Sequence, residues 1–426
     1  MTSFTLSLRI SLIAGSLAAA GAAQAQSARE VIDGYADLAL AKYSDSLAAA
    51  KALDAAIDAF IAAPSAETHK AGKDAWLAAR VPYQQTEVYR FGNAVVDDWE
   101  GKVNAWPLDE GLIDYVDTGY YGEMSEENGF FRANVIANPD LTVGGQSVDA
   151  REITPALLQE LHEIDGIEAN VATGYHAIEF LLWGQDTNGT GPGAGSRSYT
   201  DFVQGDGCTN APCDRRADYL AAVSDLLVAD LKDIVTAWED GGAARTDLAA
   251  QSDAEGLATI LTGMGSLSYG ELAGERMKLG LILHDPEEEH DCFADNTHNS
   301  HYYDAKGIQN VYLGRYERPD GTVMEVPSLA GLAQSVNSEV DAVVTARLEA
   351  TMAAMGAMKD RADSGVEAYD QMIGYGNDTG NAIVQAAIDA LVDQTRAFED
   401  LVAALDASEI SVEGSDSLDN PGAVFE

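Results

Sequence analysis

A histidine and a glutamate lie three residues apart inside a strongly apolar stretch of the chain, Gly174–Asp186. Positions i and i+3 share one face of an α-helix, so His176 and Glu179 would direct their polar ends to the same side. A neutral imidazole with a carboxylate is a common half-set of ligands for iron, zinc or copper. Gly174 allows a close approach of backbone or ligand. The stretch therefore predicts a metal site in which both side chains are direct ligands.

Other interpretations of this pair remain open. In a chain with 70 acidic residues, a histidine will have an acid three positions on by chance, as His284 and Glu287 show. Pro286 makes that second pair a poor helix. A surface pair, or a buried pair that only holds helices together, would use the same residue types as His176 and Glu179. The apolar setting argues against the surface pair, because burial of an unpaired charge is costly.

Helices must position these side chains, since no convincing series of strands is present. The composition is rich in alanine and 46% hydrophobic, which favours an all-α fold. Apolar residues recur at helical spacing over residues 27–62, 65–91, 214–239, 257–283, 337–358 and 383–405.

The domain organisation follows from length and from one break in the chain. A chain of 426 residues suggests two domains, and each half supplies about four helices long enough to pack as a bundle. The glycine-rich segment 186–212 is the clearest break. We therefore expect an N-terminal bundle over residues 26–205 and a C-terminal bundle over residues 206–426.

Residues 1–25 have the features of a secretory signal peptide. Arg9 supplies the positive charge, an apolar run follows over residues 10–21, and Ala23-Gln24-Ala25 is a typical cleavage site. The run is too short to span a bilayer comfortably, and no later segment is long and apolar enough. We expect an exported, soluble, periplasmic protein that begins at Gln26 and has no membrane insertion after cleavage.

Cysteine usage bears on the redox environment of the protein, and net charge bears on the classes of partner that it can bind. Cys208 and Cys213 either close a local disulfide or remain free thiols, and Cys292 is left over as a partly buried thiol. The formal net charge is −45, from 25 basic and 70 acidic residues. This charge disfavours nucleic acid and anionic membranes as partners and favours cations without selecting one.

The pattern G-x-H-x-x-E, formed here by Gly174, His176 and Glu179, resembles the signature of the imelysin family. Four further stretches resemble its iron-regulated protein A branch: WLAARVPYQQTEVYRFG (76–92), WPLDEGLIDY (106–115), GELAGERM (270–277) and EEEHDCFADNTH (287–298). The resemblance implies two helical bundles side by side with a functional cleft at their interface. It also implies a metal ion or small metal chelate as ligand, with iron favoured and zinc or copper as alternatives.

Charged residues on two predicted helices could complete such a site. They are spaced so that they share helix faces, which ordinary solvated helices also show. The resemblance makes walls of the cleft the stronger interpretation, with carboxylates as further metal ligands and guanidinium groups for an anionic chelate. These pocket candidates are Arg80, Glu87, Arg90, Glu271, Glu275 and Arg276.

A second zone, residues 284–301, holds four of the seven histidines. His290, His298 and His301 are candidates for a second metal group there. The simpler interpretation is a loop held by local hydrogen bonds, because D-N-T at residues 295–297 is rich in turn formers.

The resemblance implies a binding protein linked to iron uptake, and the residues themselves give little support for an enzyme. The family is named for a peptidase, and a metallopeptidase needs a metal, an activated water and a general base. Neither H-E-x-x-H nor H-x-x-E-H is present, since Phe180 follows Glu179. A metallopeptidase therefore stays an alternative without chemical support, and a structural or surface protein without a metal is the third interpretation.

Overall fold

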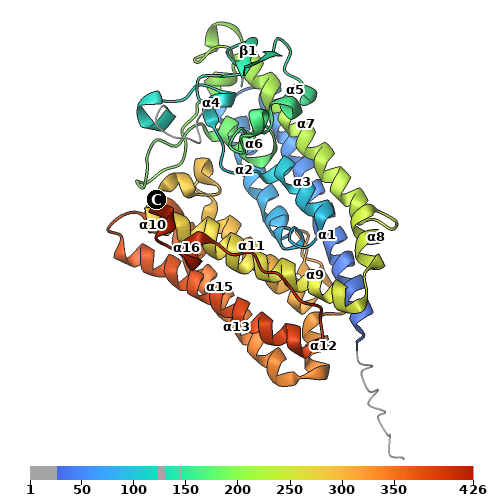
Figure 1. Ribbon diagram of the computed structural model, residues 1–426. Coiled ribbons are helices and arrows are strands. Elements are labelled where there is room, and N and C mark those ends of the chain that lie inside the picture. The colour runs from blue at the N-terminus through green and yellow to red at the C-terminus, as the bar shows by residue number, and fades with distance from the viewer. Residues whose placement is uncertain (1–25, 123–129, 144, 426) are drawn as a thin grey trace, which may run out of the picture.

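The computed structural model describes residues 26–122, 130–143 and 145–425, so the predicted signal peptide lies outside the described residues. Helices dominate the described chain, which confirms the predicted all-α class (Figure 1). Two short antiparallel hairpins interrupt them. These are β1 (Asp140–Val143) with β2 (Gln146–Asp149), and β3 (Arg315–Glu317) with β4 (Val323–Glu325).

A first group of helices packs around the N-terminal helix. Its long members are α1 (Ala28–Ala62), α2 (Ala66–Gln84), α3 (Ala94–Asn104), α6 (Gly174–Trp183) and α7 (Cys213–Trp238). α1 begins at a capping box, in which Ser27 and Glu30 satisfy each other's free backbone N–H groups. α7 follows the predicted boundary at residue 205, yet it packs along α1 and contacts α3 and α6 (Figure 1). The division into residues 26–205 and 206–426 stays a prediction.

A second group of helices packs beside the first. Its long members are α9 (Asp253–Ser266), the π-helix η7 (Leu267–Leu279), α11 (Thr297–Leu313), α13 (Ser338–Asp363) and α15 (Asp378–Ala404). α13 and α15 form a neighbouring pair at one side of the molecule (Figure 1). The shorter helices are α4 (Glu110–Ile113), α5 (Pro155–Leu161), α8 (Ala243–Ala250), α10 (Gly280–Leu283), α12 (Leu329–Val336), α14 (Tyr369–Ile373) and α16 (Asp416–Asp419).

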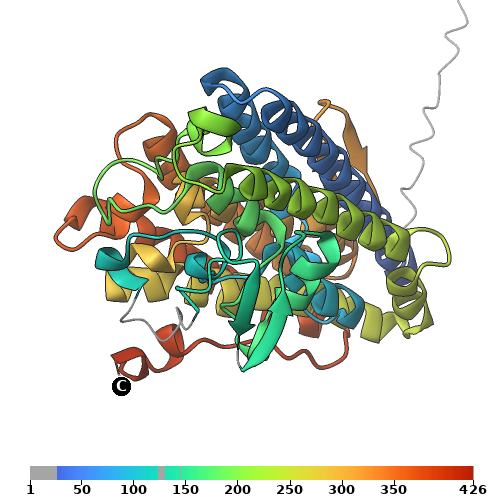
Figure 2. The same ribbon diagram turned by 90° about the horizontal axis from the view of Figure 1, so that it is seen from above.

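The C-terminal segment runs back over η7. The hydroxyl of Ser417 donates to the carbonyl of Gly274 at 2.9 Å, and a side chain at Gly274 would overlap Ser415. Figure 2 shows this segment following the edge of the molecule to the C-terminus. It closes one side of η7, the helix that carries Glu271 and Arg276.

The structure bears on two expectations from the sequence, the pairing of the cysteines and the presence of a membrane-spanning helix. Cys208 and Cys213 form a disulfide with a Cα–Cα distance of 5.9 Å, and Cys292 is a buried free thiol. Among the helices of the described ranges, we find none with the length and apolar character needed to cross a membrane.

Candidate metal centre

Gly174 sets the position of α6, the helix that carries His176 and Glu179. Its φ is +80°, and a Cβ built there would lie 2.4 Å from the carbonyl oxygen of Val103 at the end of α3. Only glycine combines this left-handed backbone with so close an approach. The Nε1 of Trp76 on α2 donates to the carbonyl of Tyr175 at 2.9 Å. α6 is therefore held against α2 and α3, and every one of its side chains is buried.

His176 and Glu179 contact each other inside the protein. The Nδ1 of His176 lies 3.0 Å from the Oε2 of Glu179, and the backbone N–H of Ala294 donates to Oε1 at 2.9 Å. The other ring nitrogen of His176, Nε2, is buried and has no hydrogen-bond partner among the described residues. Burial lowers the pKa of His176 well below its usual value. The imidazole is therefore neutral near pH 7 and has one nitrogen free for a ligand.

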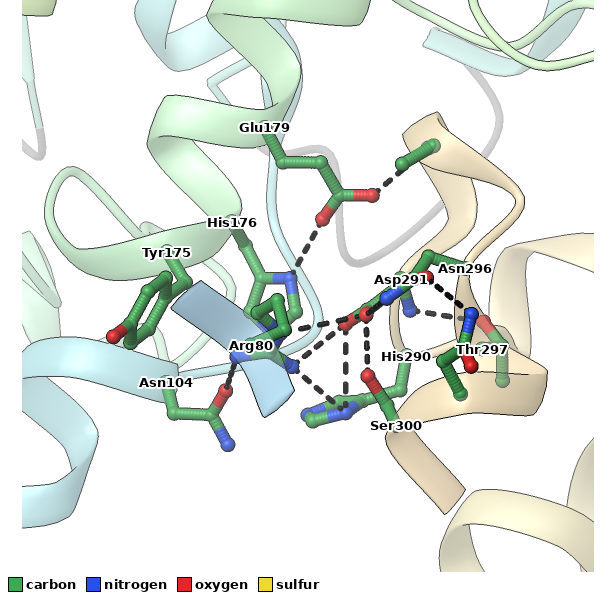
Figure 3. A network of polar contacts seen from close by, with 12 residues as sticks. Arg80, Asn104, Tyr175, His176, Glu179, His290, Asp291, Asn296, Thr297 and Ser300 are labelled. Atoms are coloured by element: carbon green, nitrogen blue, oxygen red, sulfur yellow. Dashed lines mark hydrogen bonds and ion pairs between the residues drawn. The ribbon is translucent and has the colours of Figure 1, made fainter. Parts of the chain in front are cut away.

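Two residues of the segment between α10 and α11, His290 and Asp291, lie beside His176 (Figure 3). The rings of His176 and His290 have centroids 4.7 Å apart. One ligand atom from each of His176, His290 and Asp291 lies within 4.8 Å of the others, and all three residues are buried. Two imidazoles and one carboxylate form a donor set suited to iron, zinc or copper, and in non-haem iron enzymes the same three ligands bind Fe(II). The donor set and the free Nε2 therefore fit a metal ion.

Arg80 supplies a positive charge to this group (Figure 3). Its guanidinium binds both carboxylate oxygens of Asp291, at 2.7 and 3.3 Å, and the amide oxygen of Asn104 at 2.7 Å. It also lies 3.5 Å from the Nδ1 of His290. Burial opposes ionisation of Asp291, but Arg80 and the hydroxyl of Ser300 lower its pKa. Arg80 thus contacts two of the residues that would bind a metal and balances the charge of Asp291.

An acidic cleft of about 600 Å³ reaches the group from the side of His290. Eight acidic side chains and two arginines, Arg90 and Arg276, line it together with Asn104 and Trp106. The half-buried indole of Trp106 has its ring centroid 5.2 Å from that of His176 and 6.5 Å from that of His290. A cleft with this excess of carboxylates attracts cations toward the buried histidines.

Four of the predicted pocket residues form an ion-pair network in the wall of this cleft: Glu87 and Arg90, which follow the end of α2, and Glu271 and Arg276 on η7. Arg276 binds Glu87 at 2.8 Å, Glu271 at 2.7 Å and Asp304 at 3.1 Å. Arg90 lies 3.6 Å from Glu271. These side chains form ion pairs with one another between the two helix groups, so their role is to form the wall of the cleft. The remaining candidate, Glu275, is exposed and lines the cleft without a place in the network.

The predicted second histidine zone divides in space. His290 joins His176, whereas the Nε2 of His298 lies 3.2 Å from the Oδ1 of Asp363 on α13. His301 is buried with its ring against Tyr369, at a centroid distance of 5.1 Å. Asp291 was missed in the sequence analysis. Its position next to His290 was the available signal, but nothing in the spacing indicated that this loop would reach α6.

The fold and site define an all-helical protein with a buried group of two histidines and one carboxylate beside an acidic cleft. The chain belongs to the imelysin family, whose model matches residues 39–398. It is 24% identical over 321 residues to iron-regulated protein A of Synechococcus elongatus, with coverage of 72% of this chain and 70% of the relative.

Two solved structures share the fold. One is described as an iron-regulated protein A precursor from Parabacteroides distasonis, with TM-score 0.59, 17% identity, and coverage of 91% of this chain and 97% of that chain. The other is an imelysin-like protein from Psychrobacter arcticum 273-4, with TM-score 0.57, 18% identity, and coverage of 90% and 97%.

Proposed function

We propose that this protein binds a metal ion, with iron as the favoured ion, through His176, His290 and Asp291. The observation that carries the proposal is the meeting of their ligand atoms within 4.8 Å beside the unpartnered Nε2 of His176. Zinc and copper accept the same donors, so the donor set alone does not select iron. The name of the Synechococcus relative, iron-regulated protein A, supports a link to iron, and a role in iron uptake is part of the proposal.

Glu179 has a different role in this proposal from the direct ligand expected from sequence. Its carboxylate accepts a hydrogen bond from the Nδ1 of His176, which fixes the tautomer that presents Nε2. Arg80 is the group that a metal must displace or share, because it already contacts Asp291 and His290. An incoming cation replaces one positive charge with another, so Asp291 keeps a counter-charge throughout.

The acidic cleft favours a cation over an anionic chelate as the species that enters. Arg90 and Arg276, the two arginines that line it, are both paired with carboxylates. An anionic chelate would have to break these pairs and pass eight acidic side chains. We therefore propose delivery of the metal as an ion or as a chelate without net negative charge.

Metal titration of the purified mature protein tests the proposal. Ferrous iron under anaerobic conditions, ferric iron, zinc and copper are each titrated into the wild type and into His176→Ala, Asp291→Asn and His298→Ala. We expect one tightly bound ion per chain, with affinity reduced at least ~100-fold in the first two variants, because His176→Ala removes a ligand and Asp291→Asn replaces a charged carboxylate ligand with a neutral amide. His298→Ala is the matched control, since its ring pairs with Asp363 outside the group.

The rival interpretations predict other results. Equal, weak and salt-sensitive binding by all variants would mean that the acidic surface binds the ions, and His176 and Glu179 would then have a structural role only. Incubation with casein tests for a metallopeptidase. Metal-dependent cleavage that disappears in His176→Ala would replace the binding proposal with an enzyme.

Export is a separate proposal. Gln26 takes part in the fold, because its Oε1 accepts from the backbone N–H of Ser328 at 2.9 Å, and Ser27 caps α1. Cleavage after Ala25 would leave both residues in place. Sequencing of the N-terminus after expression with the full leader tests this, with Gln26 expected as the first residue and the protein expected in the periplasmic fraction.

A further inference from the structure

The last residue of α3, Asn104, is a buried side chain that lines the acidic cleft and has one hydrogen-bonding group without a partner. It is 3% exposed and borders the cleft together with Trp106 and His290. Its Oδ1 accepts from the Nη1 of Arg80 at 2.7 Å, whereas its Nδ2 has no hydrogen-bond partner among the described residues. A buried amide N–H without an acceptor is costly, so this position calls for an acceptor from outside the chain.

Arg80 fixes the orientation of this amide. A guanidinium group carries only donors, so Asn104 must turn its oxygen toward Arg80 and its nitrogen away from it (Figure 3). Arg80 holds Asn104 through Nη1 but Asp291 through Nη2 and Nε. It can therefore release Asp291 to a metal and keep Asn104, and Nδ2 stays available as a donor in both states.

Asn104 and the candidate metal ligands contact the same guanidinium. The Nη2 of Arg80 lies 3.5 Å from the Nδ1 of His290, while Nη1 holds Asn104. His290 and Asn104 both line the cleft of about 600 Å³, a volume that accommodates a small organic molecule. Three protein ligands leave coordination positions of a metal open to a further ligand. A molecule in the cleft can therefore reach the metal and Asn104 together.

We infer, on the basis of the metal binding proposed above, that the cleft takes a small uncharged oxygen chelator of the hydroxamate class, which shares the metal and accepts a hydrogen bond from Asn104 Nδ2. The N–H of Asn104 requires an acceptor, and the eight acidic side chains of the cleft oppose an anion. A carbonyl oxygen has two lone pairs, one for the metal and one for the hydrogen bond. Coordination releases the hydroxyl proton of the hydroxamic acid, which the carboxylates of the cleft can accept. The indole of Trp106 offers an apolar surface to the carbon atoms of the chelator.

Ligand titration of the copper-loaded mature protein tests this inference. The affinity for copper(II) is measured first for each variant, and acetohydroxamic acid or pyridine is then added while the absorption of the copper is recorded. Pyridine is the comparison ligand, because it binds through one nitrogen and has no group that accepts from Asn104. The variants are Asn104→Asp and Asn104→Ala. Asn93→Asp is the matched control, since Asn93 directly precedes α3, is buried, and has an Nδ2 without a partner among the described residues, but lies outside the cleft.

We expect Asn93→Asp to match the wild type for both ligands. Asn104→Asp keeps an oxygen for Arg80 but loses the donor, so it should bind acetohydroxamic acid at least ~10-fold more weakly and pyridine within about twofold of the wild type. Asn104→Ala should show the same selective loss without an added charge. Circular dichroism of each variant shows whether it folds.

Three results would overturn the inference and leave metal binding intact. Equal losses for acetohydroxamic acid and pyridine would mean that Asn104 acts only on the metal ligands, through Arg80. Unchanged affinity for acetohydroxamic acid in both Asn104 variants would mean that water alone accepts from Nδ2. Wild-type protein that binds copper but not acetohydroxamic acid would exclude the chelator. Failure of the wild type to bind copper would instead refute the proposed function, and the inference with it.

Discussion

The imidazole Nδ1 of His176 lies 3.0 Å from Glu179 Oε2, and this contact leaves Nε2 as the ring nitrogen without a partner in a side chain that lies beside His290 and Asp291. The i, i+3 spacing of the family signature thus places one acid where it orients the histidine. A carboxylate in this position also makes the imidazole a better donor to a metal.

Glu179→Gln should weaken metal binding about 10- to 100-fold while His176→Ala nearly abolishes it. Glutamine keeps an acceptor for Nδ1 but loses the negative charge, so the ring stays oriented and becomes a weaker ligand. Competition titration with a chromogenic chelator measures both affinities. Glu168→Gln, an exposed carboxylate of the same cleft, is the control and should match the wild type. Equal losses in Glu179→Gln and His176→Ala would make Glu179 a direct ligand.

Arg80→Met should lower the stability of the metal-free protein and raise its affinity for the metal. Without the guanidinium, buried Asp291 has no counter-charge, and loss of one member of a buried pair costs about 3–5 kcal/mol. Urea unfolding of metal-free protein should show that loss. A metal then becomes the counter-charge of Asp291, so affinity should rise at least ~10-fold, or 1.4 kcal/mol. Arg396→Met, whose exposed side chain pairs with Asp393, should change neither property. Weaker metal binding in Arg80→Met would contradict the displacement of Arg80.

Gly174→Ala should destabilise the protein more than Gly205→Ala does. Both glycines have positive φ, +80° and +70°, so alanine is strained at either position by about 1–3 kcal/mol. Nothing lies within 4 Å of a Cβ at Gly205, whereas one at Gly174 would meet the carbonyl of Val103 at 2.4 Å. The difference between their unfolding free energies isolates the contact between α6 and α3. Equal free energies would mean that α6 shifts at no cost.

Loss of a proton from Asp370, whose pKa burial and the charge of Asp295 raise, should make the protein lose stability as the pH rises from 5 to 8. The pKa of Asp370 is about 8 in the folded chain against an ordinary 3.8, so between these values the folded state holds a proton that the unfolded state has released. Raising the pH removes that proton and, with it, the proton's contribution to the free energy of unfolding. Asp370→Asn should reduce the loss by about 1 kcal/mol or more, the equivalent of one pKa unit. Urea midpoints at pH 5 and 8 measure this difference, and an equal loss of stability in the wild type and Asp370→Asn would contradict the assignment to Asp370.

Local sequence patterns predicted those features of the molecule that residues close together in the chain form. The His176–Glu179 contact lies within one turn of a single helix, and Gly174 already indicated a close approach of backbone. Periodicity also predicted most long helices, because their apolar stripes face a core. These features depend on residues near one another in the chain, so a single sequence contains the information.

Contacts between distant segments could not be predicted in this way. Asp291 contacts Arg80, which lies 211 positions away in the chain. The loop between α10 and α11 that carries Asp291 has no periodic pattern that fixes its path. The same holds for α7, whose apolar face packs on α1 although the glycine-rich break precedes it. Arg276 was identified as a pocket residue, but its pairing with both Glu87 and Asp304 follows from the packing of three helices.

The half-buried Trp106 gives the site an optical signal of its own. Its indole lies beside the rings of His176 and His290, at the mouth of the acidic cleft. A paramagnetic ion bound to those histidines would quench its fluorescence, whereas diamagnetic zinc would leave the emission bright. Loading and release can therefore be followed in real time on unlabelled protein, and Trp106→Phe, which keeps the other four tryptophans, shows how much of the signal comes from Trp106.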